Sequence, residues 1–225
     1  MCGRYTITIS IEELMLRYLI GEVSIPFQRP RYNVAPTQKV YAVVNDGHAN
    51  RLGLLQWGLI PAWAKDASYG SKMLNARAET VWSKPAFEGL VRRKRCIIPA
   101  DGFYEWKKTS TGKQPMRIAL RTREVFSMAG LYDTWTMPDG SKLSTCTIIT
   151  TEPNELMAPI HNRMPVILKR EDEAAWLDRS TQDQETLGKL LVPYAAAAEL
   201  EAYPVSPKVG YVANDDPSCI APFEE

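Results

Sequence analysis

Short runs rich in apolar and β-branched residues recur along the chain, and residues typical of turns separate several of them. Runs of this kind are typical of β-strands. Two of the separating turns are Asp46-Gly47 and Pro138-Asp139-Gly140. The pattern predicts strands over residues 39–45, 52–57, 96–100, 103–108, 115–120, 125–131, 144–151 and 164–168.

A second pattern, in which a polar cap precedes an amphipathic segment, predicts helices. Ser10 and Glu13 have the spacing of a capping box. Leu14 and Tyr18 then supply an apolar face, so a short helix is expected over 11–20. Further helices are expected over 84–93, 170–178 and 182–192, the last one capped near Ser180 or Thr181.

The remaining segments are expected to be ordered loops. Residues 21–37 contain three prolines and are expected to be extended, and residues 58–76 show little periodicity. The chain has no internal repeat and no linker rich in Gly or Ser. We therefore predict one α+β domain over residues 1–225, built on mixed or antiparallel β-structure in a barrel-like arrangement with a few peripheral helices.

Composition narrows the class of protein. The 225 residues are 45% hydrophobic and 24% charged, which is ordinary for a globular protein. No apolar run reaches the roughly 18 residues of a membrane span, and the first residues lack the apolar core of a signal peptide. The expected location is therefore the cytoplasm, with no membrane partner.

Cysteine and histidine usage argues against a metal centre. The four cysteines, Cys2, Cys96, Cys146 and Cys219, are far apart and show no C-x-x-C spacing, and the only histidines are His48 and His161. These counts disfavour a zinc site and a disulfide framework. No metal and no cofactor are expected.

Charge is distributed unevenly although the net charge is only +1. Residues 1–112 hold 16 Lys and Arg against 9 Asp and Glu, whereas residues 113–225 hold 11 against 17. A basic half can meet an acidic partner such as a nucleic acid. Alternatively, the two halves interleave in the fold and their charges cancel.

Cys2 is the first residue with candidate chemistry. If Met1 is removed, Cys2 carries an α-amine and a thiol on adjacent carbons, both partly nucleophilic at neutral pH. An aldehyde can form a Schiff base with the amine, and the thiol can then close a five-membered thiazolidine. The alternative is that Cys2 is a small buried hydrophobic residue.

Two titratable residues are candidates for proton transfer. Glu105 stands between Tyr104 and Trp106, and apolar surroundings would raise the pKa of its carboxyl. The alternative is an outward-facing Glu on an alternating strand. His161 precedes Arg163, whose cation would favour the neutral imidazole; the alternative is a structural histidine.

Uncharged, basic and aromatic residues could bind a nucleic acid. The amides of Asn33 and Asn75 can hold a sugar hydroxyl or orient an amine, or can stabilise turns. Arg4 and Arg77 can contact phosphates, or can form surface salt bridges. Trp63 and Phe103 can stack on bases, at about 1–3 kcal/mol per base, or can pack in the core.

Five stretches combine these polar residues with aromatics and prolines. They are Arg31-Tyr32-Asn33-Val34-Ala35-Pro36, Trp57-Gly58-Leu59-Ile60-Pro61-Ala62-Trp63, Asn75-Ala76-Arg77-Ala78-Glu79-Thr80, Pro99-Ala100-Asp101-Gly102-Phe103-Tyr104-Glu105-Trp106 and Ile160-His161-Asn162-Arg163-Met164-Pro165. Together with the opening Cys2-Gly3-Arg4, and in this order, they resemble the SRAP family, the SOS-response-associated peptidase domain that shields abasic sites. The resemblance runs from Cys2 to about Val209.

The resemblance implies that the N-terminal cysteine captures an abasic site in single-stranded DNA as a thiazolidine crosslink, which protects the strand from cleavage. It implies a monomer that is nucleoid-associated when bound to DNA. One departure is Trp63-Ala64, where some members have two adjacent tryptophans, and this bears on the strength of base stacking. The implied catalytic residues are Cys2, Asn75, Glu105 and His161, and the implied DNA contacts are Arg4, Asn33, Trp63, Arg77, Phe103 and Thr150.

Two other functions remain open on the sequence. One is a cysteine peptidase that uses Cys2 as an N-terminal nucleophile, and that acts only on itself in its simplest form. The other is a single-strand-binding module in which Cys2 is inert. The division of roles between Glu105 and His161 also stays open.

Overall fold

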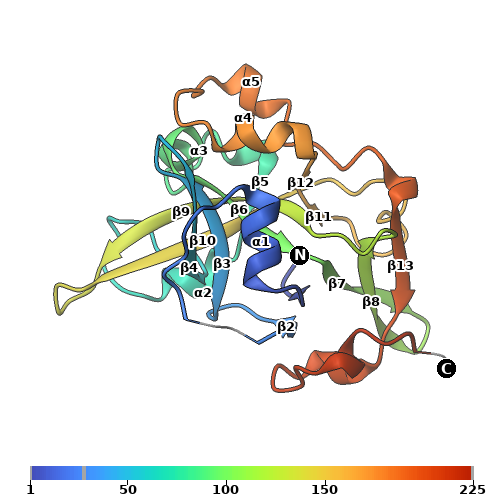
Figure 1. Cartoon of the computed structure of the whole chain (residues 1–225). Coiled ribbons are helices and arrows are strands. Elements are labelled where there is room, and N and C mark those ends of the chain that lie inside the picture. Colours follow the sequence, from blue (N-terminus) through green and yellow to red (C-terminus); the bar gives the residue numbers. More distant parts are fainter. Residues whose placement is uncertain (1, 27–28, 224–225) are drawn as a thin grey trace.

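A computed structural model describes residues 2–26 and 29–223. Its largest feature is a five-stranded barrel, because the strand pairings close on themselves: β10 pairs β4, β4 pairs β3, β3 pairs β6, β6 pairs β9, and β9 pairs β10 (Figure 1). The β4–β10 pair is parallel and the others are antiparallel. The barrel strands are β3 (Lys39–Asn45), β4 (Asn50–Trp57), β6 (Arg95–Ala100), β9 (Phe126–Thr136) and β10 (Lys142–Thr151).

Three short strands extend this sheet, and a second sheet packs beside it. β5 (Asn75–Arg77) and β11 (Met164–Pro165) pair with β10, and β12 (Ile167–Leu168) pairs with β9. The second sheet is antiparallel and has the order β13-β8-β7-β1-β2. Its strands are β1 (Tyr5–Ile7), β2 (Arg31–Val34), β7 (Gly102–Thr109), β8 (Gly112–Leu120) and β13 (Leu200–Pro204).

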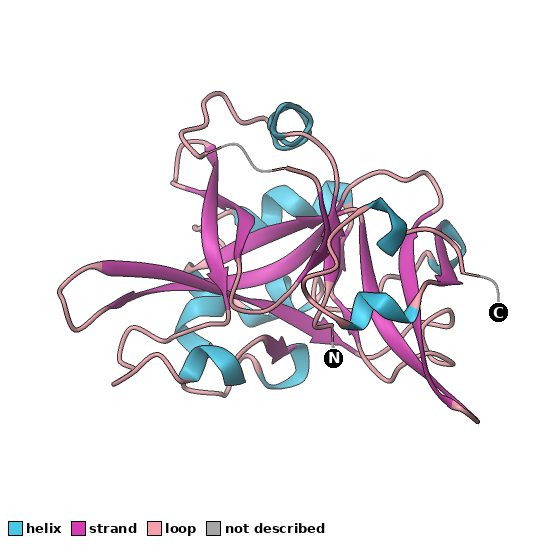
Figure 2. Ribbon diagram, turned by 90° about the horizontal axis from the view of Figure 1, so that it is seen from below, coloured by secondary structure: helices cyan, strands magenta, loops and turns pink. Residues whose placement is uncertain are grey.

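The helices are short and lie around the strands (Figure 2). The prediction of an α+β fold on mixed, barrel-like β-structure is therefore confirmed. Within the described residues, no helix is both long and apolar enough to cross a membrane. The helices are α1 (Ile11–Tyr18), α2 (Tyr69–Lys72), α3 (Glu88–Arg93), α4 (Glu173–Leu177) and α5 (Gln184–Gly188).

The helix predictions were right in place but wrong in length. α1 ends at Tyr18 because Leu19 takes a left-handed conformation with φ 54° and caps the helix. The helices predicted over 170–178 and 182–192 are present only as the shorter α4 and α5. Asp183, not Ser180 or Thr181, caps α5 by accepting a hydrogen bond from the Thr186 amide.

One apolar core joins the barrel to the second sheet. The rings of Tyr5 on β1 and Trp57 on β4 lie 5.5 Å apart in an edge-to-face contact. Phe103 on β7 meets Phe126 on β9 in the same way at 6.3 Å. Edge-to-face aromatic pairs are favourable beyond the area that they bury, so the two sheets are fixed relative to each other.

A buried carboxylate fixes the N-terminal strand. Asp101 accepts hydrogen bonds from the Thr6 hydroxyl and from the Thr8 amide (2.6 Å), and it pairs with Arg117 at 3.3 Å. Gly102 leaves room for this pair, because a Cβ there would lie 2.7 Å from Cζ of Arg117. β1 therefore has a defined position, and Cys2 stands three residues before it.

Candidate active site

Cys2 lies beside Glu105 because of the way β1 pairs with β7. Tyr5 lies opposite Phe103 in this antiparallel pair, and the Tyr104 amide donates to the Arg4 carbonyl at 2.9 Å. The same register, continued toward the N-terminus, brings Gly3 opposite Glu105 and Cys2 opposite Trp106, so Cys2 lies next to Glu105. Cys2 is fully buried. Burial raises the pKa of its thiol, and the charge of Glu105 raises it further.

Glu105 points inward, so the alternative of an outward-facing side chain is wrong. It is only 2% exposed and lies on the same face of β7 as the buried Phe103. Burial raises the pKa of its carboxyl above the ordinary value. A carboxyl with a raised pKa can hold or release a proton closer to neutral pH than an exposed one.

His161 lies in the loop before β11, a strand of the barrel sheet, and its side chain approaches Glu105 of the second sheet. Its Nε2 lies 3.9 Å from Oε2 of Glu105, and its Nδ1 accepts a hydrogen bond from the Arg163 amide at 3.1 Å. Nδ1 also lies 3.4 Å from the Arg163 carbonyl oxygen. When Nδ1 accepts from the amide, the neutral ring carries its proton on Nε2, on the side of Glu105.

The pKa of His161 is lowered, as expected, but the expected cause was wrong. Burial is the main cause, and Lys108 adds a smaller effect. The guanidinium of Arg163 instead pairs with Glu79, with distances of 2.7 and 3.0 Å between their atoms.

This ion pair ties two of the sequence motifs together. Besides binding Glu79, Nη2 of Arg163 donates to the Thr150 carbonyl at 2.6 Å. Thr150 lies opposite Arg77 of β5 and Pro165 of β11 in the sheet. The loop that carries His161 is therefore anchored to the strand end that carries Arg77.

Asn75 arrives at the same end of β10 through strand pairing. Asn75, on β5, lies opposite Ile148 of β10. The carbonyl of the preceding residue, Leu74, accepts a hydrogen bond from the indole of the buried Trp57 at 2.9 Å. The Nδ2 atom of Asn75 is buried and has no acceptor among the described residues. A buried donor without an acceptor is costly, so Asn75 is well placed to donate to a ligand.

Arg4 and Asn33 form a structural hub instead of an exposed DNA surface. Asn33 is fully buried, and its Nδ2 donates to the carbonyls of Val209, Tyr211 and Asn214 at 2.7–3.2 Å. Its Oδ1 accepts from Arg4 at 3.0 Å. The polar atoms of Asn33 thus bind the C-terminal segment, and its contact with DNA stays a prediction.

The Arg4 guanidinium also donates several of its hydrogen bonds within the protein. Its guanidinium donates to the carbonyls of Val209 (2.8 Å) and Gly210 (3.1 Å) as well as to Asn33. It is half-buried, and three of the five N–H donors of a guanidinium are thereby occupied. At most the remaining donors are open to a phosphate.

Phe103 and Thr150 are buried as well. Phe103 is fully buried against Phe126, which favours the alternative of core packing, and its stacking on a base stays a prediction. Thr150 is 1% exposed, and its hydroxyl lies 3.5 Å from the Ala76 carbonyl. The structure gives Thr150 a role in supporting Arg163, in place of the exposed DNA contact that was expected.

Arg77 and Trp63 remain as exposed candidates for DNA contacts. Arg77 is exposed at the end of β5. Trp63 is 58% exposed, with its ring 5.5 Å from Tyr69 in an edge-to-face contact. Gly58 shapes this loop, because its φ is 126° and a Cβ would lie 2.5 Å from the Gly70 carbonyl oxygen. The close approach of the Gly70 carbonyl and the positive φ thus explain why a glycine follows Trp57.

Three supporting residues stand inside the quoted motifs: Glu79, Asp101 and Arg163. Glu79 and Asp101 were given no role from the sequence, and Arg163 was expected only to act on His161 through its charge. Each fixes a loop or strand that carries a candidate residue. Charged residues spaced among aromatics and prolines were the only signal for them.

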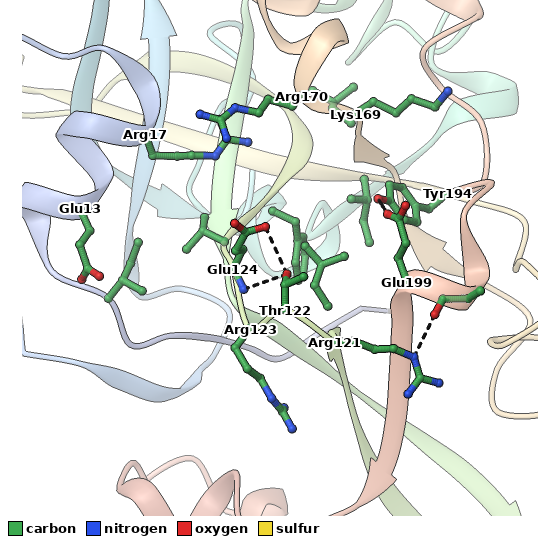
Figure 3. Close-up of a pocket in the computed structure, with 17 residues that line it drawn as sticks. Glu13, Arg17, Arg121, Thr122, Arg123, Glu124, Lys169, Arg170, Tyr194 and Glu199 are labelled. Carbon is green, nitrogen blue, oxygen red and sulfur yellow. Dashed lines mark hydrogen bonds between the residues drawn. The ribbon is translucent and has the colours of Figure 1, made fainter.

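A cleft away from Cys2, Glu105 and His161 contains none of the predicted site residues. It has a volume of about 790 Å³ between α1, β8 and β12 (Figure 3). Its charged groups are partly satisfied within the protein: Thr122 bonds Glu124, and Arg121 donates to the Ala198 carbonyl. Within the described residues, no group of three or more His, Cys, Asp or Glu is placed to hold a metal ion.

Several known proteins resemble this chain along most of its length. Abasic site processing protein YoqW of Bacillus subtilis (strain 168) is 50% identical over 222 residues, which cover 98% of this chain and 99% of that protein. Abasic site processing protein HMCES of Gallus gallus is 34% identical over an aligned length of 229 residues, gaps included, and the match covers 87% of this chain and 67% of that protein.

Structural comparison agrees. A crystal structure of a protein from Bacteroides thetaiotaomicron matches with a TM-score of 0.89 at 28% identity, and the match covers 99% of this chain and 100% of that one. The family model described as SOS response associated peptidase (SRAP) matches residues 1–212. The chain, with its motifs gathered around Cys2, Glu105 and His161, therefore belongs to the SRAP family.

Proposed function

We propose that this protein binds single-stranded DNA at an abasic site and captures the site covalently through Cys2. The observation that carries the proposal is the placement of Cys2 beside the buried carboxyl of Glu105, with Nε2 of His161 3.9 Å from that carboxyl. The names of the relatives, which are abasic site processing proteins, support the same substrate.

The chemistry requires both nucleophiles of Cys2 and balances without an oxidant. After removal of Met1, the amine adds to the C1′ aldehyde of the open sugar, and loss of water gives an imine. The thiol sulfur then bonds to the same carbon, and its proton passes to the nitrogen. The product is a thiazolidine, in which no imine remains to promote β-elimination of the strand.

The Cys2 thiol is fully buried, which disfavours its thiolate form. A thiol that stays protonated needs a partner to take its proton as the ring closes. Glu105 and His161 are placed to move protons there and during the loss of water. Asn75 offers its buried Nδ2 donor to the sugar. Arg77 and Trp63 hold the flanking phosphate and base.

A peptidase function is less well supported. Cysteines that attack peptide bonds act as thiolates, usually with a lowered pKa. The pKa of Cys2 is raised instead, and burial is the main cause. The family name alone carries the peptidase interpretation.

Intact-mass measurement after incubation with an abasic single-stranded oligonucleotide tests the proposal. The parent protein should gain the oligonucleotide mass less one water, and Cys2→Ala should not form a stable adduct. A chain with extra residues before Cys2 should also fail, because it has no α-amine on Cys2. Cleavage of a peptide without mass gain would indicate the peptidase instead, and neither result would indicate an inert binding module.

A further inference from the structure

A second, smaller cleft lies beside the candidate active site. It has a volume of about 310 Å³, and its walls include Trp82, Leu191, Val192 and Pro193, with the carboxylates of Glu79 and Glu152. We call it the side cleft. Its volume is at the lower end of the range for small-molecule sites, about 300–1,000 Å³.

The side cleft begins directly beyond the predicted phosphate contact. Thr150 and Arg77 lie opposite each other in the β10–β5 pair, and the next residue of each strand, Thr151 and Ala78, lines the cleft. Glu79, which binds Arg163, also lines it. A DNA strand bound at Arg77 would therefore run close to the mouth of the side cleft.

The walls suit the flat face and polar edge of a nucleobase. Trp82 and Val192 supply apolar surface, and Val192 is 50% exposed. The Arg92 guanidinium lies 5.5 Å from the Trp82 ring centroid and braces it. Aromatic and apolar side chains bind unpaired bases in this way.

Glu152 supplies the group that can discriminate between bases. It is exposed, and among the described residues it makes no hydrogen bond or ion pair, unlike Glu79. A carboxylate only accepts hydrogen bonds. Guanine presents two adjacent donors, N1–H and the N2 amine, on its Watson–Crick edge, whereas thymine presents one donor between two carbonyls. This edge is open only in an unpaired strand.

We propose that the side cleft receives a base next to the abasic nucleotide and that Glu152 makes it prefer guanine over thymine. The proposal rests on the proposed function, because it requires the strand to run past Arg77. It names a sequence context for that same site.

The test measures binding without chemistry. Single strands carry a tetrahydrofuran abasic analogue, which has no aldehyde, with guanine or thymine on its 5′ or its 3′ side and all other bases identical. Dissociation constants are measured by fluorescence anisotropy at one salt concentration. We expect guanine to bind about fivefold to tenfold more tightly than thymine on one of the two sides, the lower range of a bidentate base contact.

Two matched variants locate the preference. Glu152→Gln should bring guanine and thymine to within about twofold of each other, because the carboxylate is lost. Glu155→Gln removes the same charge from an exposed residue three positions away that does not line the cleft, and it should keep the parent preference. Thermal unfolding shows whether both variants are folded.

The outcomes separate this inference from the proposed function. Equal binding of guanine and thymine on both sides, or a preference that survives in Glu152→Gln, would overturn the inference even if crosslinking to an aldehyde-bearing site succeeds. A guanine preference that depends on Glu152, together with no crosslinking, would support the side cleft and refute covalent capture by Cys2.

Discussion

Glu105 is buried in a position that is unfavourable for a charge. Its raised pKa means that the folded protein holds the proton to a higher pH than the unfolded chain does. The stability associated with this group is therefore complete below the ordinary carboxyl pKa, about 4.3, and is lost as pH rises through the raised value in the folded state. Retaining such a residue is typical of a functional site.

Glu105→Gln should consequently change stability in a pH-dependent way. Glutamine cannot ionise, so the variant avoids the cost of a buried charge. We expect its melting temperature relative to the parent to be higher at pH 7.5 than at pH 4.5. Melting curves of both proteins at the two pH values measure this, and a pH-independent difference would show that Glu105 titrates normally.

The same substitution should slow covalent capture. General acid–base catalysis contributes about 10²–10⁴-fold, so single-turnover crosslinking by Glu105→Gln should slow within that range. Affinity for intact single-stranded DNA should stay within about twofold of the parent, since no phosphate contact is removed. If the variant lost affinity alone, Glu105 would be a binding or structural residue.

Cys2→Ser separates the amine from the thiol. The amine can still form an imine, but the hydroxyl is a weaker nucleophile for ring closure. We expect an adduct that heat dissociates more readily, and more strand cleavage than with the parent. Denaturing gels before and after heating measure both quantities, and an equally durable adduct would exclude sulfur from the linkage.

At the scale of elements, the site depends on loops that ion pairs hold in place. The Arg163–Glu79 pair connects the loop before β11 to the segment after β5, and the Arg163 amide fixes the His161 ring. Arg163 lowers the pKa of Glu79, chiefly by hydrogen bonding. The stability from this pair is present above the ordinary Glu pKa and is lost as pH falls through the lowered value.

Glu79→Gln should therefore affect the site more than the fold. Glu79 is 44% exposed, so solvent screening limits the pair's effect on global stability to about 0–1 kcal/mol. Crosslinking should slow by about threefold to tenfold because His161 is held less firmly, at an order-of-magnitude estimate. Single-turnover rates and urea unfolding, measured side by side, test whether the loss falls on the rate and not on stability.

The pattern of the chain predicted all five barrel strands but not the short strands β1, β2, β5 and β13. β1 and β5 are three residues long, too short for a periodic signal. β2 contains Arg31 and Asn33, polar residues that are typical of loops. In the fold, Arg31 pairs with Asp215 and Asn33 donates to the C-terminal segment. Partners distant in sequence made these segments strands.

At the scale of the whole molecule, the basic and acidic halves of the sequence interleave. β9 and β10, from the acidic half, pair with strands of the basic half: β9 with β6, and β10 with β4 and β5. Charge along the sequence is therefore a poor guide to the DNA-binding surface. The prediction of a single domain over residues 1–225 stays a prediction, supported by the core that spans both sheets.

The exposed position of Trp63 predicts a preference for single-stranded over double-stranded DNA. Trp63 stands out from its loop, where it can stack on an unpaired base but not on one inside a duplex. Crosslinking should be at least about tenfold faster for an abasic site in a single strand than in a continuous duplex. Non-covalent affinity should also fall as salt rises. Equal rates on the two substrates, compared at one salt concentration, would contradict this assignment.

The family, the β-rich class and the reactive groups follow from the amino-acid sequence alone, because they depend on residue identity and local periodicity. Cys2, Glu105, His161 and Asn75 could all be named from their motifs. Which candidates are accessible follows only from the fold: Asn33 and Phe103 are buried, whereas Arg77 and Trp63 are exposed. Burial, and with it the pKa of a group such as Glu105, depends on segments that are distant in sequence, as the C-terminal segment is for Asn33.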